Sequence, residues 1–476
     1  GVTIVWSQLL QLRSPLDRLK AKYPTRGIEL ERLSSTLAGQ SQEPHIEISP
    51  SENSTLMSSL AKDVHAVAER RESLIIEIWQ LPGFKDFLLP KQLSELAIAA
   101  THHPIIILIA NDKQANALVL MPGLADDVLH IPLPLVDNEI LRAIYSTIKT
   151  LVQGFLPNRE VLDNISDRLG IRRKWQDPDV KEKEFQWALL MLWVRIAKPI
   201  VDGLALTTHH LTRIWWCSTG SFSFLPLHAV GDYSSDAPIG SKLNEYAISS
   251  YTPSVAALLE VQNSVLLYIA DVATPEITEP KELKILAVAQ PSALPGTETE
   301  VDHIQKHSGD LIQVETLEGS SAIIEKVTTE MASNDWVHFA CHSTQNIQEP
   351  LQSSLVLAGT SRLTINDIIA MQLPPKGLAF LSACQTATGD ENLSTEAVHL
   401  AAGMLSAGYQ TVIATMWSIS DSHAPQVADD VYGFLFKGSK NDTSQAAEAL
   451  HYAIQNLREK DKVSFATWVP FIHVGL

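Results

Sequence analysis

Two short apolar segments, each ending in a reactive side chain, constrain this chain most. The first runs from Asp335 to His342 and the second from Leu378 to Cys384. Both are rich in residues that favour the interior of a β-sheet, and the carboxyl ends of neighbouring parallel strands meet at one edge of a sheet. The sequence therefore predicts that an imidazole and a thiol lie close together at such an edge.

The segments around this pair alternate between strands and helices. We predict strands at 283–290, 311–317, 335–342, 378–384, 410–417 and 468–474. We predict helices at 297–307, 321–333, 394–407, 422–436 and 443–459, and a hairpin-like insertion at 353–372. This order is typical of the α/β class, with a mostly parallel sheet flanked by helices.

A second α/β layer without an obvious reactive pair is predicted upstream. Its expected strands are 74–79, 105–110, 117–121, 128–133, 214–217 and 246–250, its expected helices are 137–154 and 182–203, and 220–226 resembles a hairpin. Residues 1–73 have helical periodicity, interrupted by a predicted loop at 38–54. Three parts follow: a helical segment (1–73), an α/β domain (74–274) and a second α/β domain (275–476). The Pro- and acid-rich connector at 275–280 marks the clearest boundary.

Composition limits the classes of partner and compartment. The chain has 476 residues, with 36 Lys and Arg against 54 Asp and Glu, a formal charge of −18, which disfavours nucleic acid or an anionic membrane as partner. Its apolar runs are far shorter than the roughly 20 residues of a membrane span. Three cysteines do not make a disulfide framework, so we expect a reducing, cytoplasmic setting. The start lacks an initiator Met, and we expect a piece of a longer protein.

The predicted pair fits nucleophilic catalysis on a peptide bond. Cys384 would attack as a thiolate, and His342 would accept its proton and later donate it to the leaving amine. The small, polar loop that follows, 385–390, is suited to present backbone N–H groups to an oxyanion. The alternative is structural, because a Cys or His at the end of a buried strand is often a core residue.

A metal site and a nucleotide site are both disfavoured. Cys341 and His342 are adjacent, and alternation along a strand directs their side chains to opposite faces, which makes Cys341 a core residue. A zinc site built from these two residues and Cys384 would lack a fourth ligand. A ligand-binding α/β domain would need a Gly-rich phosphate loop after a strand, and the sequence has none. We therefore expect no metal and no cofactor.

Several ordered motifs resemble one protease family. The segments 337–342, 353–357, 381–387, 408–417 and 468–475 are similar to CHAT proteases, which are caspase-like cysteine peptidases related to separase and often fused to tetratricopeptide or other helical repeats. The segments 81–88 and 216–229 resemble the amino-terminal half of fungal CHAT proteins. The resemblance implies a caspase-hemoglobinase-like fold with a non-catalytic half that supports an active half.

The same resemblance implies roles for individual residues. The family's dyad falls on His342 and Cys384, which makes the chain a cysteine endopeptidase with a protein or peptide substrate, and relatives are commonly gated by their repeat regions. The oxyanion donors would be the backbone N–H groups of Cys384 and Ser343. In this family Gly commonly follows the base, and Ser343 departs from that pattern, because Ser adopts strained conformations less freely than Gly. The alternative function is a catalytically silent pseudo-protease that acts as an interaction module.

An acidic residue is expected to set the preference for the side chain at P1, the substrate residue before the scissile bond. Separase-like relatives place a carboxylate for a basic P1 residue on the loop that here carries Asp421, and such a carboxylate would pair with Arg or Lys. Asp390 and Glu391 are the other candidates. The structural alternative is that Asp421 caps the helix beginning near Ser422.

Overall fold

The structure, a computed structural model, describes most of the chain. The described residues are 16, 19–20, 22–40, 53–89, 91–124, 127–170, 180–272, 282–292, 294–309, 312–344, 346, 349–385, 396–419, 421–437, 443–461 and 463–476. Backbone contacts separate a compact unit at Ser7–Gln92 from a larger one that spans Leu93–Leu476. None of the described helices combines the length and the apolar character that a bilayer crossing requires.

The described part of the smaller unit includes the helices α2 (Pro24–Gln40) and α3 (Asn53–Trp79). They enclose a buried apolar cluster of Leu19, Leu30, Leu33, Leu74, Ile78, Phe84 and Phe87. The predicted strand at 74–79 is wrong, because α3 continues through it and buries Leu74 and Ile78, four positions apart, on one face. Most of the predicted loop at 38–54 lies outside the described residues.

The larger unit is built on one continuous sheet. Its strands are β1 (Ile105–Ala110), β2 (Ala115–Leu120), β3 (Leu129–Leu133), β4 (Thr212–Ser218), β5 (Ala247–Tyr251), β6 (Leu283–Ala289), β7 (Ile312–Glu318), β8 (Trp336–Thr344), β9 (Ser354–Val356), β10 (Arg362–Thr364), β11 (Lys376–Gln385), β12 (Tyr409–Thr415) and β13 (Phe471–Gly475). The order is β10-β9-β8-β11-β12-β13-β5-β4-β1-β2-β3, with β7 paired to β6 and β6 paired to β8. The sheet runs through both predicted α/β layers.

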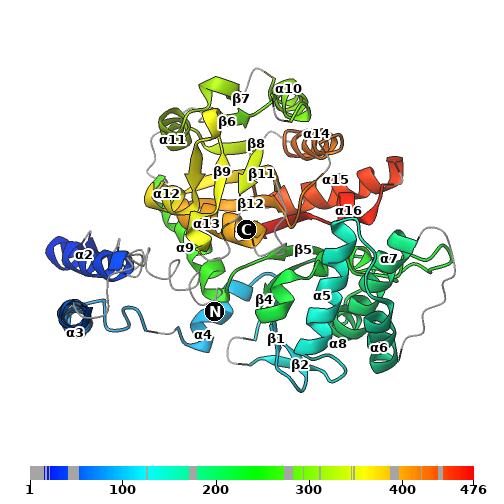
Figure 1. Cartoon of the computed structure of the whole chain (residues 1–476), viewed down its shortest axis with the longest axis horizontal. Coiled ribbons are helices and arrows are strands. Elements are labelled where there is room, and N and C mark those ends of the chain that lie inside the picture. The colour runs from blue at the N-terminus through cyan, green and yellow to red at the C-terminus, as the bar shows by residue number, and fades with distance from the viewer. Residues whose placement is uncertain are drawn as a thin grey trace. The chain divides into compact units, whose positions relative to one another are not determined.

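Helices cover both faces of this sheet. They are α4 (Leu93–Ala97), α5 (Asn138–Val152), α6 (Arg159–Leu169), α7 (Val180–Leu192), α8 (Lys198–Gly203), α9 (Val255–Val272), α10 (Gly296–Ser308), α11 (Ile324–Ser333), α12 (Ile365–Ala370), α13 (Glu396–Ala407), α14 (Ala424–Leu435), α15 (Ala446–Asp461) and α16 (Phe465–Trp468). Around β6, β8 and β11, Figure 1 shows α10 and α14 on one side and α11 and α12 on the other.

Strand directions confirm the predicted α/β class. The neighbours β7, β6, β8, β11 and β12 are parallel, as are β5, β4 and β1, whereas β2, β3, β9 and β10 pair antiparallel. The strand β13 is antiparallel to β12 and parallel to β5, so it joins the two parts of the sheet. Buried apolar residues fill most of β6, β8 and β12, as expected for strands covered on both faces.

Three local predictions were wrong or incomplete. Residues 220–226 form a 3₁₀ turn at Gly220–Phe224 rather than a hairpin, and Gly220 enters it at a φ of +56°, which Gly adopts readily. The final strand starts at Phe471 because Phe465–Trp468 is helical. The helices α6 and α9 were not predicted; the buried face of α9 comes from a nearly continuous apolar run whose periodicity does not separate helix from strand.

Candidate active site

The register of β8 and β11 brings the two predicted catalytic positions together. The two strands are parallel, and the Cα of Cys384 pairs with the Cα of His342. Neighbouring strands lie about 4.8 Å apart, and positions that pair in register belong to the same face of the sheet. The backbone therefore places Cys384 beside His342; the Cys384 thiol lies outside the described atoms.

The shared face is the one covered by α10 and α14. His338, four positions before His342 on β8, contacts Glu300 of α10 through Nε2 and Tyr432 of α14 through Nδ1, both at 3.1 Å. Because side chains alternate along a strand, His338 and His342 belong to one face. The dyad positions thus lie at the carboxyl end of β8 and β11, on the side of these two helices.

The His342 imidazole is partly buried and has a free nitrogen. Its Nδ1 atom is shielded from solvent and has no hydrogen-bond partner among the described residues. Buried polar atoms in folded proteins are nearly always satisfied, so an orphaned one requires an explanation. A reacting group at the neighbouring Cys384 position would supply such a partner.

Ser343 lies inside the sheet rather than on a loop after β8. It pairs in register with Leu355 of β9 and with Gln385 of β11, and its side chain is buried. A residue flanked by strands on both sides directs its N–H toward a neighbouring strand. The predicted use of this N–H as an oxyanion donor stays a prediction.

Asp421 caps a helix, but not the predicted one. Its Oδ2 atom accepts a 2.9 Å hydrogen bond from the N–H of Gly296, the first residue of α10. The following helix, α14, begins at Ala424 after His423, which makes no side-chain capping bond. The Asp421 side chain remains partly exposed. The other candidate acids, Asp390 and Glu391, lie outside the described residues.

The contact between Asp421 and Gly296 spans the strands of the dyad. Gly296 follows β6 and Asp421 follows β12, and both loops leave the carboxyl ends of parallel strands. Between β6 and β12 lie only β8 and β11. The two loops therefore meet across the ends of the strands that carry His342 and Cys384.

Two other cysteines are unsuited to catalysis. Cys341 is fully buried, as predicted for a core residue, and neither it nor Cys217 forms a disulfide. Burial raises the pKa of the Cys217 thiol to about 12, so it stays protonated at neutral pH. Within the described part of the chain, no group of three or more His, Cys, Asp or Glu residues is arranged to hold a metal ion.

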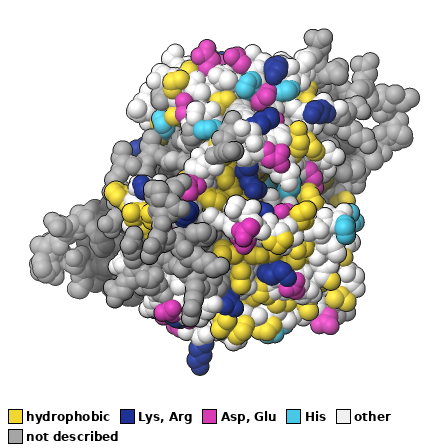
Figure 2. Space-filling view, turned by 90° about the vertical axis from the view of Figure 1, so that its right-hand side faces the viewer, with side chains coloured by type: hydrophobic (Ala, Val, Ile, Leu, Met, Phe, Trp, Pro, Cys, Tyr) yellow, Lys and Arg dark blue, Asp and Glu magenta, His cyan; other side chains and the backbone are white. Residues whose placement is uncertain are grey.

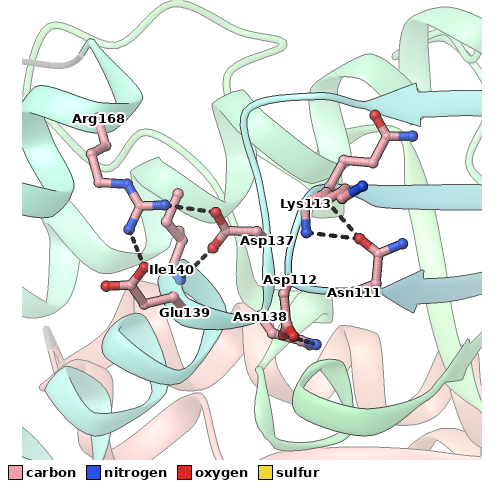
Figure 3. Close-up of polar contacts among 9 residues, drawn as sticks. Asn111, Asp112, Lys113, Asp137, Asn138, Glu139, Ile140 and Arg168 are labelled. Atoms are coloured by element: carbon pink, nitrogen blue, oxygen red, sulfur yellow. Dashed lines mark hydrogen bonds and ion pairs between the residues drawn. The ribbon is translucent and has the colours of Figure 1, made fainter.

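The corresponding edge of the upstream sheet is occupied by structural polar contacts (Figure 3). Asn111 follows β1, and its Oδ1 accepts from the backbone N–H of Lys113 and of Gln114, which closes the turn into β2. Asp137 caps α5 by accepting from the N–H of Ile140, and Arg168 pairs with the same carboxylate at 2.6 Å. These side chains close a turn and cap the start of a helix.

The buried trio of Glu300, His338 and Tyr432 was not predicted from the sequence. All three side chains are almost fully inaccessible to solvent. Burial raises the pKa of the Tyr432 hydroxyl well above its usual value, and the Glu300 carboxylate adds to that shift. His338 and Tyr432 lie 94 positions apart, so only the fold reveals their contact. In the sequence, the one indication of such a contact was the position of His338 within an otherwise apolar strand.

Comparison with known proteins decides the family. The model of the CHAT domain matches residues 188–476, which is more than half of the chain. The chain belongs to the CHAT domain family. The α/β class predicted for this CHAT chain, a mostly parallel sheet flanked by helices, is confirmed. A search of curated proteins finds no match.

Solved structures similar to this CHAT chain have low sequence identity to it. A chain of the Saccharomyces cerevisiae separase–securin complex, in a crystal structure at 3.0 Å, is 13% identical with a TM-score of 0.47 and covers 81% of this chain. The complex of the pro- and mature domains of Porphyromonas gingivalis RgpB is 12% identical with a TM-score of 0.39, covering 71% of this chain and 75% of that chain. The CHAT chain corresponds to only 30% of the separase-complex chain.

Proposed function

We propose that this chain is a cysteine endopeptidase that cleaves a protein substrate with a dyad of His342 and Cys384. The observation that carries the proposal is the register of β8 and β11, which pairs these two positions on one face at the carboxyl edge of the sheet. Membership of the CHAT family and the unpartnered Nδ1 of His342 support it.

The reaction requires only these two side chains and water. His342 removes the thiol proton, and the Cys384 sulfur attacks the scissile carbonyl carbon, whose oxygen becomes an oxyanion. Protonated His342 then donates its proton to the leaving amine, which yields a thioester. A water molecule, deprotonated by His342, attacks the carbonyl carbon of this thioester; the C–S bond breaks, the acid is released, and the Cys384 sulfur regains its proton from His342. We assign the oxyanion donors to the N–H groups of Cys384 and Ser343, which requires Ser343 to turn its N–H away from the neighbouring strand.

A basic P1 side chain is the preference that we propose. Asp421 lies on the loop after β12, partly exposed, with one carboxylate oxygen accepting from Gly296. No hydrogen bond joins its second oxygen to a described residue, and this oxygen would receive a guanidinium or an ammonium group, which pair strongly with carboxylates in partly desolvated sites.

We further propose that activity depends on regions outside the catalytic half. The helical unit at Ser7–Gln92 would belong to an upstream sensor or repeat region that engages a regulatory partner. The predicted domain at 74–274, from Leu93 onward, would be a pseudo-protease half, and 275–476 would be the catalytic half. A cytoplasmic location suits a thiol nucleophile, which needs a reducing environment to stay free.

A catalytically silent interaction module is the second candidate. The position of Ser343 favours it, because this residue replaces the usual Gly and is flanked by β9 and β11. If its N–H cannot leave the ladder, the oxyanion would lose one donor, at a cost of roughly 10²–10³ in rate.

The experiment that tests the proposal is covalent labelling followed by intact-protein mass spectrometry. A peptidyl acyloxymethyl ketone that ends in Arg should add one equivalent at Cys384. The adduct should be absent from Cys384→Ala, strongly slowed in His342→Ala and unchanged in Cys341→Ser. A folded protein that stays unlabelled at millimolar reagent supports the interaction module instead.

A further inference from the structure

We propose that Gly296 and Glu300 of α10 are positioning residues that fix the Asp421 carboxylate above the dyad strands and so determine the preference for a basic P1 residue. This inference rests on the proposed peptidase function and adds residues to its specificity site. None of these α10 residues belongs to the dyad.

The first support is the closeness of the Asp421 loop to Gly296. A Cβ atom at position 296 would lie 2.3 Å from the backbone oxygen of Asp421 and 2.8 Å from its Oδ1 atom. Real Cβ atoms do not approach other atoms this closely, so any side chain at this position must displace the loop. Gly296 therefore permits the contact as well as donating the hydrogen bond that orients the carboxylate.

The start of α10 is electrostatically suited to hold this carboxylate. The first N–H groups of a helix have no partner within the helix, and the aligned peptide dipoles place partial positive charge there. Asp421 satisfies one of these N–H groups from outside the helix. A carboxylate held in this way has a fixed direction, which a freely rotating acid on an exposed loop does not.

The second support is the buried anchor of α10. Glu300 lies one turn after Gly296, and its Oε2 atom contacts His338 Nε2 at 3.1 Å in the protein interior. The same imidazole contacts Tyr432 of α14 at 3.1 Å. His338 therefore links α10 and α14 to β8, the strand that carries His342. Two helices are thus fixed to β8: α10, which contacts Asp421 through Gly296, and α14, which follows the Asp421 loop.

A second, more exposed set of side-chain contacts joins α10 and α14. His307 Nε2 contacts Asp429 Oδ1 at 2.7 Å, Lys306 approaches the same atom at 3.3 Å, and His303 Nδ1 contacts the carbonyl oxygen of Pro425 at 3.0 Å. On the face shown in Figure 2, side chains of both charges and histidines are interspersed over the upper part, where α10 and α14 lie. Exposed pairs of this kind add little stability, so the buried contact of Glu300 is the stronger restraint.

The consequence is a separation between chemistry and specificity. Displacing α10 or its first residue would move Asp421 but leave the strand register of His342 and Cys384 unchanged. The charge preference at P1 should then fall while the reactivity of the thiol persists.

The test compares two irreversible reagents that differ only in charge. Peptidyl acyloxymethyl ketones ending in Arg and in citrulline, its neutral isostere, are reacted with the whole chain, and the ratio of their rate constants at Cys384 is measured. We expect a ratio above tenfold for the wild type and a ratio within threefold of unity for Gly296→Ala and for Glu300→Ala. Alkylation by iodoacetamide, which has no P1 group, should change less than twofold in either variant.

Two further variants keep the test specific. Glu300→Gln retains a carbonyl acceptor for His338 and should recover most of the ratio, which loss of stability alone would not produce. Glu298→Ala removes an exposed carboxylate from the same turn of α10 and should leave the ratio unchanged. Gly296→Ala keeps the test valid if Glu300→Ala does not fold.

Three outcomes would overturn the inference, and they differ from one another. A folded Gly296→Ala that keeps the wild-type ratio shows that α10 does not position the acid. Equal rates for both ketones in the wild type remove Asp421 from specificity while leaving the dyad intact. No labelling of the wild type by either ketone removes the peptidase function and this inference with it.

Discussion

The indole N–H of Trp215 donates a 2.7 Å hydrogen bond to the backbone oxygen of Gly475, 260 positions later in the chain. Trp215 lies on β4 in the upstream part of the sheet and Gly475 ends β13 in the downstream part. Beside them, His473 Nδ1 contacts the hydroxyl of Ser250 on β5 at 2.9 Å. Buried side-chain contacts thus reinforce a junction at which only Val474 and Tyr251 pair in backbone register.

This junction predicts that the two parts remain associated after the chain is cut between them. A specific protease site placed within the predicted connector at 275–280 should be cleavable without separating the pieces, because aromatic contacts such as Phe185 with Phe465 and the β13–β5 pairing cross the boundary. Gel filtration of the cut protein should give one peak containing both pieces. Two separate peaks without denaturant would contradict the prediction. An uncut sample is the control.

A buried histidine at the same junction predicts sensitivity to acid. His228 Nδ1 contacts the Tyr251 hydroxyl at 2.9 Å, and Nε2 contacts the carbonyl oxygen of Val469 at 2.8 Å. Burial lowers the pKa of His228 to about 4, and the Val469 carbonyl opposes this shift only partly. The unfolded chain, with a His pKa near ~6.5, binds more protons between these values. The contribution of uncharged His228 to the free energy of unfolding is therefore fully present above about pH 6.5 and is lost as pH falls toward 4. At pH 5 the loss is roughly 2 kcal/mol.

The measurement is urea unfolding at pH 7.5 and pH 5.0. His228→Gln cannot titrate, so we expect it to be less stable than the wild type at pH 7.5 but to lose less stability on acidification. His209→Gln changes an exposed histidine and should behave as the wild type. An unchanged pH dependence in His228→Gln would assign the acid sensitivity to other groups, such as His473, whose pKa burial also lowers well below its usual value.

Thiol reactivity gives a prediction that does not depend on a peptide substrate. Iodoacetamide at pH 7.5 should modify one thiol in the native protein, and peptide mapping should place it at Cys384. Cys341 is fully buried, and burial raises the pKa of Cys217 to about 12, so neither presents a thiolate to the reagent. All three should react in denaturant. A native adduct at Cys341 would mean that β8 opens more readily than its burial indicates.

The fold of residues 275–476 was largely predictable because its strands are short, apolar and separated by periodic helices. The expected segments 283–290 and 335–342 correspond closely to β6 and β8, and the juxtaposition of His342 with Cys384 followed from the topology of parallel strands. Contacts between distant side chains were not predictable. The bond from Gly296 to Asp421 joins loops 125 positions apart, and nothing in either local sequence indicates the other.

Sequence periodicity did not distinguish a helix from a strand where a short apolar run suited both. Leu74–Trp79 has the composition of a strand, yet it ends α3, because burial of Leu74 and Ile78 on one helical face satisfies the same residues. The sequence also allowed Asp421 to cap the helix that follows it. The structure uses it to cap α10, an arrangement that only the adjacency of β6, β8, β11 and β12 produces.

Gly408, within one of the CHAT-like motifs, should be intolerant of any side chain. It links α13 to β12 with a φ of +126°, and a Cβ there would lie 2.7 Å from the backbone oxygen of Leu373. The Gly408 oxygen also accepts from the N–H of Lys376 at 2.9 Å, where β11 begins. A displaced Gly408 would therefore disturb the strand that carries Cys384.

We expect Gly408→Ala to lower the free energy of unfolding by more than ~3 kcal/mol, since it combines backbone strain with a steric clash against main-chain atoms. Gly359→Ala is the matched control, because Gly359 also has a positive φ, +62° with a ψ of 25°, but a Cβ at that position would meet no described atom within 4 Å. That substitution should cost about 1–2 kcal/mol, the strain of the left-handed region alone. Chemical denaturation of both variants measures the difference. Equal losses would show that the loop at Leu373 moves aside at little cost and that Gly408 is required for its φ alone.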